Sequence, residues 1–165
     1  MSMTGELYRV SAGRLEELLA APSRIKEELS PADNALDEGK ECSVEKTWNA
    51  IEFMLDRLAE LGRIPWIGPL TEGTETGVSL HYGPVWYRTP QEVRDIANVL
   101  AGVSRDEFRQ GFMPDLMSKH NVYPHIWDEG DKDALFDYVW DWYSPMVRFY
   151  QQAAEHGDGM LLWTG

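Results

Sequence analysis

Side chains that can bind a ligand gather in two segments with the composition of loops and turns, around residues 82–88 and 121–127. Loops carry a large share of binding residues, and aromatic side chains combine apolar area with polar groups. If the two segments meet in space, they would line a cleft for a small molecule. Anchoring of the loops on the core is the competing role for the same rings, and we favour it. The candidate ligand-binding residues are Tyr82, Trp86, Arg88, Tyr123, His125 and Trp127.

The same region contains residues of the types that bind metal ions. His120 and His125 are five residues apart, and Asp128 follows three residues later. Imidazole and carboxylate groups bind zinc and iron, but this spacing does not place two histidines one helical turn apart and matches no common ligand signature. We therefore predict no metal site here.

Catalytic signatures are also missing from the sequence. There is no Gly-x-Ser-x-Gly elbow, no phosphate-binding Walker loop and no dinucleotide fingerprint. Cys42 lies near Lys40 and Lys46, but Glu41 and Glu45 beside it oppose thiolate formation. We predict no catalytic residue and no cofactor, and the pattern leaves open whether the protein is an enzyme.

The charge of the chain limits its partners. The formal net charge is −13, with 28 acidic and 15 basic residues and no basic stripe. Nucleic acid and anionic membranes would repel such a protein, whereas a basic protein would be attracted to it. Asp133, Asp137 and Asp141 form a row of the kind that docks a basic partner; the competing role is a solvated face that keeps the protein soluble.

Compartment signals are few. Cys42 is the only cysteine, which excludes an internal disulfide and suits a reducing compartment. Residues 1–6 lack the basic and apolar regions of a secretory signal, and no apolar run approaches the roughly 20 residues of a membrane helix. We expect a cytoplasmic protein.

Local patterns predict the elements of the first half. Residues 3–10 alternate and predict a strand, and Ser11 caps a short helix. Residues 30–42 are polar and predict a surface loop. Residues 43–61 predict the clearest helix, because Val44, Trp48, Ile51 and Leu55 recur at three- and four-residue spacing. Residues 62–79 are rich in Gly, Pro and Thr and predict a long loop.

The second half reads as helices followed by a last strand. Residues 78–88 predict a strand interrupted at Gly83-Pro84, and Thr89-Pro90-Gln91-Glu92 predicts a capped helix start. Asp131 opens a long aromatic helix that Pro145 is expected to kink or break near Trp142. Residues 160–164 predict a strand beside the first one. These patterns predict one compact α+β domain over residues 1–165, with a small sheet that includes both terminal strands and packs against several helices.

Several motifs occur in an order and spacing that resemble the YfbM-like bacterial proteins, a domain of unknown function. The resemblance covers nearly the whole chain and implies a compact α+β fold with the terminal strands in one sheet. It supplies no reaction, ligand or catalytic set. Asn49 and Glu52 stand where that family often carries histidine. The motifs are Met3-Thr4-Gly5, residues 45–55, residues 87–93, Phe112-Met113-Pro114 through Met117, Val122-Tyr123-Pro124 with Ile126-Trp127, and residues 149–154.

Two functional hypotheses follow from the sequence. The favoured one is a non-enzymatic acidic module that binds or regulates a basic protein, since the chain is acidic and lacks catalytic signatures. The alternative is a small-molecule-binding or enzymatic domain that uses the aromatic and histidine-containing loop cleft.

Overall fold

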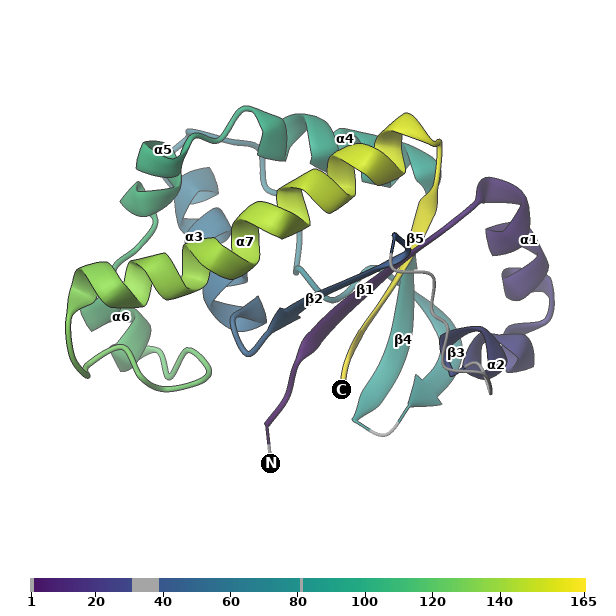
Figure 1. Cartoon of the computed structure of the whole chain (residues 1–165), viewed down its shortest axis with the longest axis horizontal. Helices are drawn as coiled ribbons and strands as arrows, with labels where there is room; N and C mark the ends of the chain where they lie inside the picture. Colours follow the sequence, from purple (N-terminus) through teal and green to yellow (C-terminus); the bar gives the residue numbers. More distant parts are fainter. Residues whose placement is uncertain (1, 31–38, 81) are drawn as a thin grey trace.

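A five-stranded antiparallel sheet forms the centre of the molecule in the computed structural model, which describes residues 2–30, 39–80 and 82–165 (Figure 1). The strand order is β2-β1-β5-β4-β3, and every neighbouring pair is antiparallel. The strands are β1 (Gly5–Val10), β2 (Glu41–Glu45), β3 (Thr74–Leu80), β4 (Gly83–Arg88) and β5 (Gly159–Thr164).

The two terminal strands lie side by side in the middle of this sheet. Their register runs from Gly5 opposite Thr164 to Val10 opposite Gly159. Beyond the strands, the backbones of Thr4 and Gly165 exchange two further hydrogen bonds of 2.7 and 2.9 Å. The predicted pairing of the terminal strands in an α+β fold is therefore confirmed.

Helices cover the sheet on both faces (Figure 1). Side chains alternate along a strand, so Leu7 and Leu162 enter the larger core under α3, α4 and α7, whereas Tyr8 and Leu161 face α1 and α2. The helices are α1 (Ala12–Ala20), the 3-10 helix η1 (Pro22–Arg24), α2 (Ile25–Leu29), α3 (Trp48–Glu60), α4 (Pro90–Ala101), α5 (Arg105–Gln110), α6 (Pro114–Lys119) and α7 (Lys132–Glu155).

Strand β2 corrects the predicted boundary between the loop at 30–42 and the helix at 43–61. Residues 41–45 form a strand on the edge of β1, and the helix begins only at Trp48. Val44 fits the helical spacing, but as a strand residue it is fully buried. The hydroxyl of Ser43 donates to Glu6 across the pair at 3.0 Å. Residues 31–38 of the predicted loop lie outside the described residues.

Strand β3 corrects the predicted loop at 62–79. It begins at Thr74 and forms a hairpin with β4. Thr76 and Val78 are buried, whereas Glu75 and Ser79 are exposed, which is the alternation of a half-buried strand. Gly77 has a φ of +82° at the irregular part of the pairing. A glycine inside a strand interrupts the alternating pattern by which a strand is predicted from sequence.

The long helix α7 continues through Pro145 and is not broken. Proline removes one helical hydrogen bond, which leaves the Asp141 carbonyl without its usual donor. Both residues are exposed, so water can hydrogen-bond to that carbonyl. Within 2–30, 39–80 and 82–165, no helix combines the length and apolar character needed to cross a membrane.

Gly111 sets the distance between α3 and the α5–α6 turn. A Cβ atom at this glycine would collide with the backbone carbonyl of Met54 in α3. Gly111 has an ordinary helical φ of −81°, so the requirement comes from space and not from backbone conformation. The missing side chain lets the turn that follows α5 lie directly against α3.

We predict that Gly111→Ala lowers the free energy of unfolding by about 2 kcal/mol or more, because the helices must separate. The control is Gly13→Ala in α1, where an added Cβ meets nothing within 4 Å. That substitution should stabilise the protein by up to about 1 kcal/mol through helix propensity. Urea denaturation measures both, and an unchanged stability of Gly111→Ala would contradict the assigned contact.

Candidate functional site

Arg88, one of the predicted ligand-binding residues, is a buried structural residue. Its side chain is 3% exposed at the end of β4. Nη1 donates to the hydroxyl of Tyr150 at 3.0 Å, and Nε and Nη2 donate to the Glu72 carbonyl at 3.3 and 2.9 Å. Nη2 also donates to the carbonyl of Pro69. The guanidinium therefore joins β4, the loop before β3 and α7.

The second predicted segment is anchored elsewhere. The hydroxyl of Tyr123 accepts from the Met3 amide at 2.9 Å, and its ring stacks on Trp48 with centroids 5.9 Å apart. The His125 ring meets the Tyr123 ring edge-on at 5.8 Å. Trp127 is fully buried, and its Nε1 donates to the Val122 carbonyl at 2.7 Å. These contacts fix the turn onto the N-terminal residues and the core.

Trp86 and Arg88 of the first predicted segment are not bonded to the second segment in the described structure. Trp86 is half-buried against the larger core, and Tyr82 is exposed in the turn between β3 and β4. In the described part of the chain, Trp86 and Arg88 make no hydrogen bond or ring contact with Tyr123, His125 or Trp127. Tyr123 and His125 are brought together, and for Trp86 and Arg88 the described structure offers no support for a cleft shared with them.

The predicted docking row on α7 faces helix α5. Asp133 pairs with Arg109, and Asp137 pairs with Arg105. The two guanidinium groups also lie over the Phe136 ring, at 4.8 Å for Arg109 and 5.2 Å for Arg105. Asp141, the third member, is exposed. Two of the three carboxylates therefore already have basic partners within the chain, which weakens the case for this row as a docking surface.

A different surface emerges as the candidate site, which we call the acidic cleft. It is a cavity of about 400 Å³ between α3 and the α6 region. Its chemical groups are three carboxylates of α3, at Glu52, Asp56 and Glu60, and the imidazole of His120 across from them. Phe53 forms part of the wall and lies 6.3 Å from the His120 ring.

Helical periodicity explains why the carboxylates line up. Glu52, Asp56 and Glu60 are four residues apart and therefore share one stripe of α3. Buried Met54 and Leu58 hold other faces of the same helix in the core. The sequence contained this signal, but the four-residue spacing was masked by the overall acidity of the chain. What it could not supply was α6, which turns the stripe into one wall of a cavity.

Burial and like charge change the ionisation of the cleft. Burial, together with the charges of Asp56 and Glu72, raises the pKa of Glu52 to about 7, although Arg88 and the Leu70 amide act in the opposite direction. Burial and Glu60 also raise the pKa of Asp56, partly offset by a hydrogen bond from Trp66 at 3.1 Å. The cleft therefore disfavours its own full negative charge and favours a cation beside it.

Polar contacts hold the walls of the cleft in place. The side-chain oxygen of Asn49 accepts from the Tyr123 amide at 2.9 Å. Arg57 is the one Lys or Arg that lines the cleft in the described structure, and it pairs with Glu60 at 2.8 Å. Its Nε also donates to the sulfur of Met113 at 3.3 Å. Three carboxylates thus face one guanidinium.

An apolar cavity continues from the acidic cleft. It has a volume of about 580 Å³ and shares Arg57 and Leu116 with the cleft. Phe112, Met113 and Pro114 supply most of its apolar wall. Met113 is 37% exposed, so its side chain is accessible to a partner. An acidic and an apolar site therefore lie next to each other on the α3–α6 surface.

Other candidate chemistry is not supported. Burial, with a smaller contribution from Glu6, raises the pKa of the Cys42 thiol to about 12, so this cysteine is not activated as a nucleophile. His120 and His125 are both exposed. Among the residues that the structure describes, no three His, Cys, Asp or Glu side chains are grouped so that they could hold a metal ion.

We predict that Glu52→Gln stabilises the protein at neutral and alkaline pH. The folded pKa of Glu52, about 7, lies above its ordinary 4.5, so the native state binds the extra proton and loses stability as pH rises through this window. Because the side chain is partly exposed, the expected gain above the window is about 1–2 kcal/mol.

Denaturation at several pH values tests this expectation. Wild type and Glu52→Gln should be equally stable below the window and diverge above it. Glu16→Gln, on the exposed face of α1, is the matched control and should give no such divergence. Parallel pH profiles for wild type and Glu52→Gln would show that the carboxyl is not perturbed.

We also predict that Arg88→Met destabilises the fold by about 3 kcal/mol, because it leaves buried carbonyl and hydroxyl groups without a donor. The control is Arg94→Met on the exposed side of α4, which should change stability by less than about 0.5 kcal/mol. Equal effects of the two substitutions in urea denaturation would contradict a structural role for Arg88.

Comparison with known proteins gives a family and a fold. The family model described as "Domain of unknown function (DUF1877)" matches residues 1–163. No curated protein matches the chain.

Among solved structures, the protein of unknown function YfbM from Escherichia coli superposes with a TM-score of 0.64 at 17% sequence identity. The match covers 96% of this chain and 98% of that one, and at this identity it shows a shared fold alone. Together with the family match, it confirms the resemblance seen in the sequence: this chain belongs to the YfbM-like family, the domain of unknown function DUF1877.

Proposed function

We propose that the protein is a binding module for a basic segment of a partner protein, and that the acidic cleft is the site of binding. One observation carries the proposal: three carboxylates on a single stripe of α3 line a cavity in which Arg57, already paired with Glu60, is the one Lys or Arg among the described residues. A lysine or arginine side chain inserted there would meet paired negative charge in a partly desolvated place, where electrostatic attraction is stronger than on an open surface.

The apolar cavity beside the cleft supports the same proposal. A peptide that places a basic side chain in the cleft would set a neighbouring apolar side chain against Met113 and Pro114. Recognition of this kind combines charge for orientation with apolar contact for affinity.

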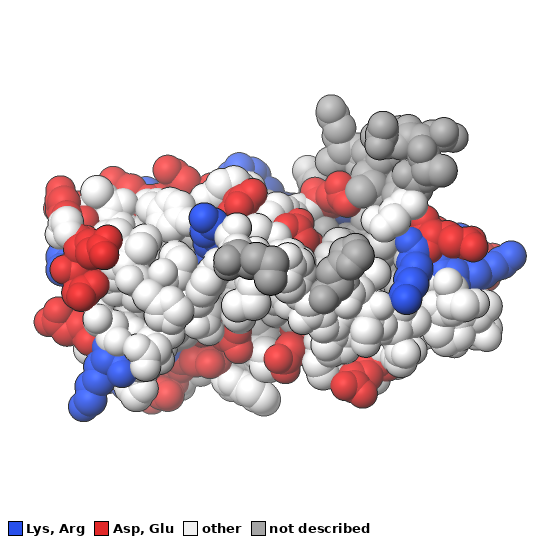
Figure 2. Space-filling model, turned by 90° about the horizontal axis from the view of Figure 1, so that it is seen from below, with Lys and Arg blue, Asp and Glu red and all other residues white. Residues whose placement is uncertain are grey.

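The acidity of the whole molecule would assist association. Figure 2 shows acidic side chains in several places on the face seen from below, with few basic side chains between them. With a net charge of −13, the protein as a whole attracts a basic partner. Long-range attraction alone gives no defined site, so the cleft supplies the specificity in this proposal.

The test is calorimetric binding of a short peptide with blocked termini that alternates lysine and leucine. We expect binding that weakens as salt rises, since screening reduces the attraction. We also expect proton release near neutral pH, because a cation beside Glu52 lowers its pKa. Proton release is measured as a binding heat that depends on the ionisation enthalpy of the buffer.

Matched variants locate the site. Glu52→Gln should weaken the peptide by at least about tenfold and abolish the proton release. Asp141→Asn, which removes the same charge from the exposed side of α7, should retain both. Equal losses in the two variants would show that only the overall charge attracts the peptide, and unchanged binding by Glu52→Gln would exclude the cleft.

A second function is favoured by one observation, the presence of a carboxyl of near-neutral pKa and of His120 in the lining of the same cavity. Such groups suit proton transfer to and from a small cationic substrate. The two functions differ in their use of the apolar cavity. Met113→Ser should weaken the lysine–leucine peptide if the ligand is a protein segment, and should leave binding of a simple alkylamine unchanged if the site serves a small molecule.

A further inference from the structure

A second cavity, of opposite character, lies at the other end of the molecule. It has a volume of about 230 Å³ and forms where β1 passes into α1, close to the turn between α7 and β5. Arg9, Arg14 and Lys40 line it together with the carboxylates of Glu28 and Asp158. We call it the Arg9 pocket. Basic side chains outnumber acidic ones in it, although the chain as a whole carries a charge of −13.

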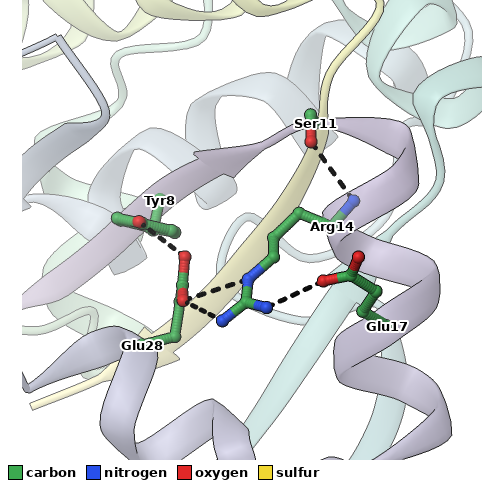
Figure 3. Close-up of polar contacts among 5 residues, drawn as sticks. All are labelled: Tyr8, Ser11, Arg14, Glu17 and Glu28. Atoms are coloured by element: carbon green, nitrogen blue, oxygen red, sulfur yellow. Dashed lines mark hydrogen bonds and ion pairs between the residues drawn. The ribbon is translucent and has the colours of Figure 1, made fainter.

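Arg14 and Glu28 are already satisfied within this pocket (Figure 3). Arg14 donates to Glu28 at 2.8 Å from Nη2 and to Glu17 at 2.8 Å from Nη1. The other oxygen of Glu28 accepts from the Tyr8 hydroxyl at 3.1 Å. These contacts neutralise the Glu28 carboxylate and hold it away from Arg9.

Arg9 is not satisfied. Its side chain is only 17% exposed, and its nearest charged neighbour is Asp158, whose Oδ2 is 3.7 Å from Nε. That distance exceeds a hydrogen bond. Nη1 is buried and has no hydrogen-bond partner anywhere in the described structure. A guanidinium carries five N–H donors in a planar fork, and leaving them buried without acceptors is energetically unfavourable.

An anion in the pocket would remove this penalty. A carboxylate is planar and accepts hydrogen bonds from a guanidinium, and Nη1 of Arg9 is a donor without an acceptor. Lys40 is exposed at the rim and adds a second positive charge.

We propose that the Arg9 pocket binds a small organic carboxylate, held by the guanidinium fork of Arg9 and the ammonium group of Lys40. The small volume admits a short-chain acid and excludes a large cofactor. This site is separate from the acidic cleft and does not depend on the function proposed for it.

Thermal unfolding of the whole protein tests the site with sodium acetate as the probe, against sodium chloride at equal ionic strength. We expect acetate to raise the Tm of wild type in a saturable way, because a ligand of the native state stabilises it. Arg9→Gln should abolish the increase, and Lys40→Gln should weaken the apparent affinity by several-fold. Arg63→Gln, at an exposed position after α3, is the matched control and should behave as wild type.

Each contrary outcome is decisive. The proposal is overturned if acetate does not stabilise wild type beyond chloride, or if Arg9→Gln keeps the full effect. A larger stabilisation by inorganic phosphate or sulfate than by acetate would overturn the assignment to carboxylates.

Because Arg9→Gln alters a strand residue, the wild type provides a second measurement. Acetate should shift the amide NMR signals of Val10, Ser11 and Asp158, which border the pocket, and leave those of α3 unchanged. Shifts spread over the whole chain would count against a defined site.

Discussion

The arrangement of β4, the loop before β3 and helix α7 depends on the hydrogen bonds of one buried guanidinium, that of Arg88. It stands at the end of β4 and donates to the carbonyls of Pro69 and Glu72 and to the hydroxyl of Tyr150. A central strand, an irregular loop and the longest helix are thereby held at one point. A buried charge is tolerated only where acceptors surround it, so this loop has little freedom to move away.

The positive charge of Arg88 also acts on a carboxyl group of α3. Arg88 favours the ionised form of Glu52, while burial and the neighbouring acids favour the neutral form, and the balance leaves the pKa of Glu52 at about 7. Because this pKa is near neutral, a cation that approaches Glu52 changes its degree of ionisation. The acidic cleft therefore gains its character from the core behind it as well as from the row of acids on the helix.

Local signals predicted much of the fold. The alternating residues 3–10, the helical stripe of α3 and the capping box at Thr89 each depend on near neighbours, and the structure confirms them. Strand β2 was missed because its formation depends on β1, which lies far away in the sequence, whereas β3 was missed because Gly77 interrupts the alternation of the β3–β4 hairpin. The site was missed because Glu52 and His120, far apart in the sequence, line one cavity only in the folded chain, where Gly111 lets the turn after α5 lie against α3. Of the aromatic residues that were expected to anchor loops, Tyr123 and Trp127 do so, whereas Tyr82 is exposed.

The core behind α3 keeps Glu52 partly neutral and partly ionised near neutral pH. A carbon-13 NMR titration of the glutamate side-chain carboxyl groups, with Glu52 assigned by comparison with Glu52→Gln, measures this directly. We predict that the Glu52 signal titrates with a pKa of about 7, and that addition of the lysine–leucine peptide lowers it. A Glu52 pKa at its ordinary value of 4.5, unchanged by the peptide, would contradict both the electrostatics of the cleft and its proposed use.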